Sequence, residues 1–133
     1  MDDAYLYFTA ATGDSVTNSK TLSKVLQEDE VTEVGRGHQK FIEVMTDGGF
    51  TSGAEVCSLH LKTGTTTPGD TKLMEVFSDV SAAILSVATT KAQRLIAKVP
   101  LPSEGVSDFI SLYFYAETAI TVGGKLLARL VLN

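Results

Sequence analysis

The chain has 133 residues, a length typical of one domain that buries a core without a disulfide or a metal ion. Its net charge is −5 and its 11 Lys and Arg residues are scattered, which argues against nucleic-acid binding, because that function depends on clustered cations. A single cysteine excludes an intrachain disulfide. The start of the chain lacks the pattern of a signal peptide, and no apolar run approaches the ~18 residues of a membrane span. We therefore expect folding in a reducing cytoplasm and no membrane partner.

Alternating apolar and polar residues predict short strands along most of the chain. In chain order the candidate segments are residues 5–9, 17–25, 41–46, 54–63, 73–77, 78–88, 94–99, 109–118 and 125–132. The segment 78–88 fits either a strand or a short helix, and we favour a strand. Pro100 should end the strand that precedes it, because proline cannot donate to a ladder.

Glycine-rich turns separate these segments at 47–49, 63–70 and 123–124. About eight short strands with such turns, and no long helix, predict an all-β domain. We expect one antiparallel β-sandwich of the jelly-roll type over residues 1–133. Residues 1–33 would form an N-terminal arm and the first strands.

Two segments have clearly assigned faces. In 54–63, Cys57, Leu59 and Leu61 share one face, and Ser58, His60 and Lys62 share the other. In 109–118 both faces are apolar, with Ile110, Leu112, Phe114 and Ala116 opposite Phe109, Tyr113 and Tyr115. Such a strand is either covered on both sides or lies at a subunit interface. Phe109, Tyr113 and Tyr115 are therefore the candidate interface of a homo-oligomer.

Reactive residues occur without the partners that chemistry requires. Cys57 and His60 are three positions apart, which places them on opposite faces of a strand, and His38 sits in a glycine loop without a second histidine nearby. The glycines at 35–37 lead into a strand, whereas a phosphate-binding loop leads into a helix. No Gly-x-Ser-x-Gly elbow is present. We expect no catalytic residue, no cofactor and no metal site, and hence not an enzyme.

The densest charge cluster is acidic and consists of Glu28, Asp29, Glu30 and Glu33. We predict a solvated loop there. The alternative is an electrostatic contact between these four carboxylates and a basic surface of a partner.

Several sequence segments carry a resemblance to a known family. They are VGRG at 34–37, TSGAEV at 51–56, AKVPLP at 97–102, DFISLYFY at 108–115 and TVGGKLLARLV at 121–131. In this order and spacing they resemble the capsid cement proteins of tailed bacteriophages, of the jelly-roll type found in the Bordetella podovirus head. The resemblance covers residues 34–132. The acidic stretch at 28–33 departs from the family's shorter loop. With the resemblance, its residues Glu28, Asp29, Glu30 and Glu33 become the candidate capsid contacts.

The resemblance implies a virion structural protein that binds the outside of an HK97-like shell. Its partners would be the major capsid protein and further copies of itself, as a dimer or trimer, at the outer capsid surface. The main alternative is a glycan- or receptor-binding jelly roll of a phage fibre, for which Tyr5, Tyr7, Tyr113 and Tyr115 are candidate contacts. A small metalloenzyme on a β scaffold is a third possibility, which the histidine positions disfavour.

Overall fold

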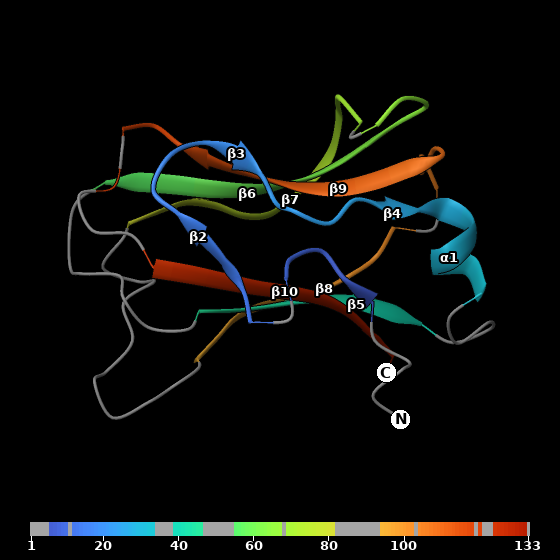
Figure 1. Ribbon diagram of the computed structural model, residues 1–133, viewed down its shortest axis with the longest axis horizontal. Helices are drawn as coiled ribbons and strands as arrows, with labels where there is room; N and C mark the ends of the chain where they lie inside the picture. The colour runs from blue at the N-terminus through green and yellow to red at the C-terminus, as the bar shows by residue number, and fades with distance from the viewer. Residues whose placement is uncertain are drawn as a thin grey trace.

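Two antiparallel sheets pack face to face in the computed structural model of the protein (Figure 1). The structure describes residues 6–10, 12–33, 39–46, 55–67, 69–81, 94–102, 104–118, 120 and 124–132. Within these residues the chain forms ten strands and one helix. They are β1 (Leu6–Tyr7), β2 (Asp14–Val16), β3 (Lys20–Thr21), β4 (Leu26–Gln27), α1 (Glu28–Glu33), β5 (Lys40–Thr46), β6 (Val56–Gly64), β7 (Thr71–Ser81), β8 (Arg94–Pro100), β9 (Phe109–Ala116) and β10 (Gly124–Leu132).

The strand order confirms the predicted all-β sandwich. Sheet A, the lower layer in Figure 1, has the order β1-β10-β5-β8, and β2 pairs with the same edge of β10 as β1. Sheet B, the upper layer, has the order β3-β9-β6-β7, and β4 pairs with β9 beside β3. Eight strands remain if β1 and β2 are counted as one interrupted strand, and β3 and β4 as another. Numbered 1 to 8 in chain order, these eight strands have the order 1-8-3-6 in sheet A and 2-7-4-5 in sheet B. This alternation between two four-stranded layers is the doubled Greek key of a jelly roll.

The interruptions in the first strands are bridged by polar side chains. Phe8 N–H still donates to Ala128 O at 2.9 Å, but Ala128 N–H donates to the Thr9 hydroxyl, at 3.3 Å, where a regular ladder would offer a carbonyl. Asp14 then links the first interrupted strand to the second, because its carboxylate accepts both the N–H and the hydroxyl of Ser23. These bonds satisfy backbone groups that the breaks would otherwise leave buried and unpaired.

The core lies between the sheets and follows the predicted alternation. The fully buried large side chains are Phe8, Val16, Leu22, Ile42, Leu59, Leu61, Ile110, Leu112, Phe114, Leu126 and Leu130. Alternate residues of β6 and β9 therefore face inward, as the sequence predicts, and Cys57 is also completely buried. On the outer side of the central strand β10, Leu127 and Val131 are also buried, at 4% and 5% exposed, whereas Lys125 on that side is exposed.

The structure corrects the predicted acidic loop at Glu28, Asp29, Glu30 and Glu33, because these residues form the helix α1. Gln27 N–H donates to Glu30 Oε1 at 2.9 Å, one half of a capping box, and Glu28 N–H donates to Asp108 O at 2.9 Å. Three carboxylates in the first turn also interact favourably with the helix dipole. Val31, only 5% exposed, anchors the helix to the core.

The segments with weaker patterns differ most from expectation. The expected strand at 5–9 pairs only over β1, and that at 17–25 pairs only over β3. The one at 73–77 is part of β7, which extends to Ser81 and so includes the first residues of 78–88. The turn at 63–70 contains Gly69 with φ +97°, as predicted from its glycines. Residues 82–88, the turn at 47–49 and the first residue of the turn at 123–124 lie outside the described residues, and Gly124 begins β10.

Candidate functional site

The outer face of sheet B carries a cluster of aromatic and charged side chains. Its members are His60 and Lys62 on β6, Lys72, Glu75 and Asp79 on β7, and Tyr113 and Tyr115 on β9, and we call it the tyrosine face. The leucines of β6 face the core, so the intervening residues point outward. Register then brings the cluster together, since His60 pairs with Tyr113 on one side and with Glu75 on the other.

Three rings form the centre of the tyrosine face. The His60 ring is nearly parallel to that of Tyr115, at 14° with centroids 6.0 Å apart, and is tilted 35° to that of Tyr113 at 6.2 Å. The Lys62 ammonium lies 4.2 Å from the Tyr113 centroid, within range of a cation–π contact. Lys62 thus covers part of Tyr113, whereas Tyr115 is 41% exposed and offers an open aromatic surface.

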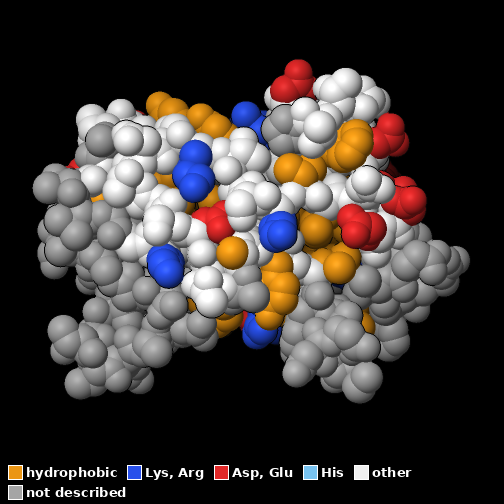
Figure 2. All heavy atoms as spheres, in the orientation of Figure 1, with side chains coloured by type: hydrophobic (Ala, Val, Ile, Leu, Met, Phe, Trp, Pro, Cys, Tyr) orange, Lys and Arg blue, Asp and Glu red, His pale blue; other side chains and the backbone are white. Residues whose placement is uncertain are grey.

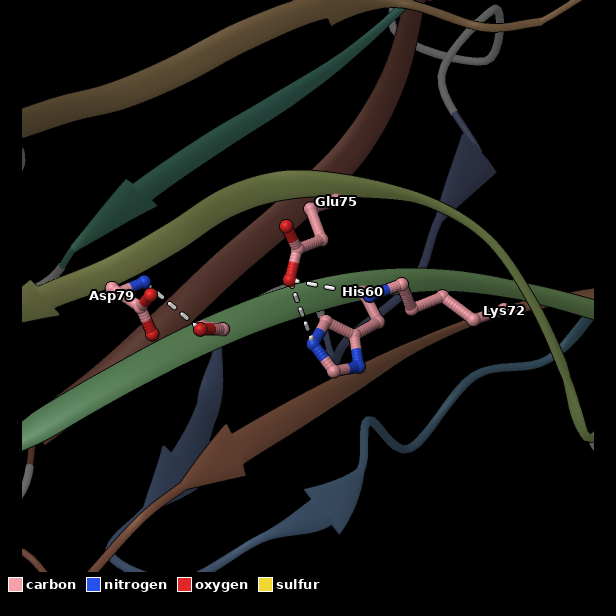
Figure 3. Close-up of polar contacts among 5 residues, drawn as sticks. His60, Lys72, Glu75 and Asp79 are labelled. Atoms are coloured by element: carbon pink, nitrogen blue, oxygen red, sulfur yellow. Dashed lines mark hydrogen bonds and ion pairs between the residues drawn. The ribbon is translucent and has the colours of Figure 1, made fainter.

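Polar groups follow β7 beside these rings (Figure 3). Glu75 Oε2 lies 3.4 Å from His60 Nε2 and 3.3 Å from Lys72 Nζ, so one carboxylate oxygen bridges the two strands. Farther along β7, Asp79 N–H donates to Ser58 Oγ at 3.0 Å. Asp79 has φ +53° and is the one non-glycine residue with positive φ in the described part of the chain. This backbone conformation is strained, and the Ser58 bond helps to hold it.

Three irregularities in the pairing of β6 with β7 determine which β7 side chains lie beside the aromatic rings. Each adds a residue to β7 relative to β6, which bends the strand and changes which side chains face outward. Lys72, Glu75 and Asp79 therefore lie along the same face although their spacing in the chain is not even.

The electrostatics of the tyrosine face keep His60 neutral near pH 7. Burial is the largest cause that lowers the pKa of His60, and the nearby Lys72 and Lys62 ammonium groups lower it further. Glu75 opposes this effect. The pKa of Glu75 is itself lowered, first by the hydrogen bond from Lys72 and then by one with Ser78. The formal charges of Lys62, Lys72, Glu75 and Asp79 balance, so the face is neutral overall.

Cys57 lies on the opposite side of β6 from this cluster, as predicted. Its side chain is completely buried, and its thiol donates to Val80 O, with Sγ 3.5 Å from the oxygen. Burial raises the pKa of this thiol to about 11. A neutral buried thiol is a poor nucleophile. Within the described ranges, no group of three or more His, Cys, Asp and Glu side chains is placed to hold a metal ion. No helix in those same ranges is long and apolar enough to cross a membrane.

The predicted oligomer interface is divided in the structure. Tyr113 and Tyr115 lie together, but Phe109 is at the other end of β9, where it pairs with Gly64 and Gln27. Ser111 separates them and is only 1% exposed. Self-association through these residues stays a prediction.

The acidic residues form a second candidate surface at the α1 end of the molecule. Glu28, Asp29 and Glu30 are exposed, and most of the Asp and Glu side chains visible in Figure 2 lie towards this end, whereas the Lys and Arg side chains lie across the middle of that view. The side chain of Glu33 lies outside the described residues. Two grooves flank the helix. One, of about 390 Å³, is lined by Gln27, Glu28, Asp29, Asp108 and Phe109. The other, of about 470 Å³ and more apolar, is lined by Leu6, Tyr7, Thr9, Lys24, Val25, Leu26 and Glu30.

Sequence reasoning named the tyrosines and the outward-facing His60 and Lys62, but not their polar neighbours on β7. Lys72 and Glu75 belong to a segment whose pattern is broken by bulges, and no local signal shows that they lie beside His60. The glycine loop with His38, and Tyr5, lie outside the described residues. Comparisons of the chain with protein-family models, with curated proteins and with solved structures found no match.

Proposed function

We propose that this protein is a capsid cement protein of a tailed bacteriophage. It would bind the outer surface of the shell and hold neighbouring major capsid protein subunits together. The observation that carries the proposal is the α1 end, where exposed carboxylates adjoin an apolar groove on a compact jelly roll. The resemblance at residues 34–132 supports the same role.

The two parts of this surface suit the two parts of a protein interface. Glu28, Asp29 and Glu30 offer negative charge to a basic patch, which steers binding and fixes orientation. Leu6, Val25 and Leu26 line the adjoining groove, which can receive apolar side chains. Each exposed ion pair contributes only about 0–1 kcal/mol, so the groove must supply much of the affinity.

A repeated lattice compensates for a modest single interface. A cement protein that contacts two neighbouring subunits, or a second copy of itself, binds its second site at high effective concentration. Many such contacts stiffen the shell without any covalent chemistry. The proposed role is therefore that of a binding protein on the virion surface, not of an enzyme.

Co-sedimentation with shells of the cognate phage that lack this protein tests the proposal. The variant Glu28→Gln, Asp29→Asn, Glu30→Gln should bind less and lose the salt dependence of the wild type. The glutamine at position 30 keeps an acceptor for the helix cap, so the fold should persist. The matched control, Asp70→Asn, Glu104→Gln, Glu117→Gln, makes the same charge change on exposed residues elsewhere and should bind normally.

Particle survival provides the second measurement. Particles without the protein should assemble but break more readily under heat or osmotic shock than particles with it. Equal survival of the two kinds of particle, together with absence of the protein from purified virions, would sink the cement proposal.

A further inference from the structure

We propose that the tyrosine face is a binding site for a neutral saccharide. This function goes beyond capsid attachment and does not depend on it, because the tyrosine face belongs to sheet B and the proposed capsid contact to the α1 end. The argument depends on three features: an open aromatic ring, a row of hydrogen-bonding groups beside it, and balanced charge.

The aromatic feature is Tyr115. Its side chain is 41% exposed, although the inward-facing residues of β9 on either side of it contribute to the core. The C–H groups of a pyranose ring are apolar and stack on such a ring, as other apolar groups pack on the faces of aromatic side chains. Tyr113 follows two positions away on the same face, about 7 Å along the strand at ~3.4 Å per residue. An oligosaccharide lying along β9 would therefore pass from Tyr115 towards Tyr113 and the Lys62 ammonium above it.

The hydrogen-bonding feature is the row of Lys72, Glu75 and Asp79 on β7. In Figure 3 Glu75 reaches towards the His60 ring, and Asp79 follows farther along the strand. The Glu75 and Lys72 side chains are 35% and 49% exposed, so a ligand can reach them. A carboxylate has about four lone-pair positions and an ammonium three N–H donors. The contacts of Glu75 with His60 and Lys72 use only part of this capacity, and saccharide hydroxyls can use the rest as donors and acceptors.

Charge balance favours a neutral ligand over an acidic one. Lys72 is paired with Glu75, and Asp79 offsets the formal charge of Lys62. His60 adds no charge near pH 7, because its pKa is lowered. A sulfated or carboxylated sugar would meet two carboxylates without an excess of cations, whereas neutral hydroxyls pair with both kinds of group.

The same charges disfavour an apolar protein partner on this face. A dry interface would desolvate the Lys72–Glu75 pair, and that penalty can exceed the attraction between the charges. The centres of protein interfaces are accordingly depleted of lysine and glutamate. A saccharide keeps such groups hydrogen-bonded, directly or through water.

The face is already ordered before a ligand arrives. Its residues lie on three hydrogen-bonded strands, and the strained backbone at Asp79 is held by Ser58. His60 is held between Glu75 and the two tyrosine rings. Little conformational entropy is then lost on binding, which favours affinity for a small ligand.

The test is calorimetric titration of the free, full-length protein with hexasaccharides of glucose, mannose and galactose, and with a heparin hexasaccharide as the acidic comparison. At least one neutral probe should bind more tightly than heparin. Tyr115→Ala should weaken that binding about tenfold, whereas Tyr115→Phe should retain it because the ring remains. Glu75→Gln combined with Asp79→Asn should weaken it by a similar factor. Leu95→Ala removes a side chain that is 54% exposed on sheet A and should have no effect.

Three outcomes would overturn the proposal. The first is that no neutral probe binds, or that heparin binds more tightly. The second is that Tyr115→Ala binds its probe as the Leu95→Ala control does, in protein shown to be folded by circular dichroism. The third is that Tyr115→Ala abolishes self-association, measured by analytical ultracentrifugation, while no saccharide binds; the face would then be the subunit interface. None of these measurements uses capsids, so failure here is distinct from failure of the cement proposal.

Discussion

His60 links the tyrosine face to pH. Its folded pKa is lowered from 6.5, so the unfolded chain binds more protons than the folded one just below that pH. The free energy of unfolding should therefore be highest above about pH 6.5 and fall as the pH drops towards the folded pKa. Protonation of Glu75 would add a further loss only below 4.5, because its pKa is lowered as well.

Urea unfolding at a series of pH values between 7.5 and 5 measures this effect. His60→Gln should flatten the fall in unfolding free energy over that interval. Glu75→Gln removes the carboxylate that favours protonated His60, so NMR titration should find a still lower His60 pKa in that variant. A wild-type His60 pKa above 6.5 would contradict the assigned role of burial and the lysines.

Cys57 should behave as a core residue. Its thiol is buried, and its pKa of about 11 leaves little thiolate near pH 7. A thiol-specific reagent should modify it only after denaturant is added. Cys57→Ser should cost about 1 kcal/mol, because serine retains a donor for Val80 O, and should leave shell and saccharide binding unchanged. Rapid modification of the native protein, or bound zinc that is lost in the variant, would contradict this interpretation.

At the scale of elements, Asp14 connects the two interrupted strands. Its carboxylate is 7% exposed and accepts the Ala10 N–H at 3.1 Å, the Ser23 N–H at 2.6 Å and the Ser23 hydroxyl at 2.9 Å. Hydrogen bonds to a charged group contribute about 1.5–3 kcal/mol each, but their losses overlap. We expect Asp14→Asn to lower the free energy of unfolding by about 2–3 kcal/mol.

Urea unfolding followed by circular dichroism measures this cost. Ser23→Ala removes only the hydroxyl and should cost less than Asp14→Asn. Asp70→Asn, on an exposed aspartate of the hairpin between β6 and β7, should stay within about 0.5 kcal/mol of the wild type. Similar losses for Asp14→Asn and Asp70→Asn would show that the Asp14 bonds do not hold the strands.

The elements also show what the sequence could predict. Strands β5, β6, β9 and β10 have seven to nine residues each, long enough for period-two alternation to assign their inner faces. Strands β1 and β4 have only two residues each, which is too short for an alternation of apolar and polar residues to be recognised in the sequence. The helix α1 was missed because its stability comes from a cap and a tertiary bond to Asp108, not from a long amphipathic pattern.

The candidate sites were likewise predictable only where a local sequence pattern marks them. The tyrosines were identifiable because β9 is apolar on both faces. Their contacts with Glu75 and Lys72 depend on bulges in β7 and on pairing between strands, which local sequence does not encode. Likewise, the sandwich class was predictable from the number of short strands, whereas the neighbours of each strand were not.

At the scale of the whole molecule, the order of the strands has a consequence for synthesis. Strand β10 pairs with β1, β2 and β5. Three strands of sheet A therefore cannot complete their hydrogen bonding until the segment Gly124–Leu132 has been synthesised. At about 5–20 residues per second, roughly 6–25 seconds separate the translation of Tyr7 from that of Leu132. Once β5 has been made, its backbone at Ile42 and Val44 lacks the β10 neighbour for the rest of that time. Until β10 is made, the nascent chain therefore exposes an unpaired sheet edge, which is a template for aggregation, and pairing with β10 removes that edge.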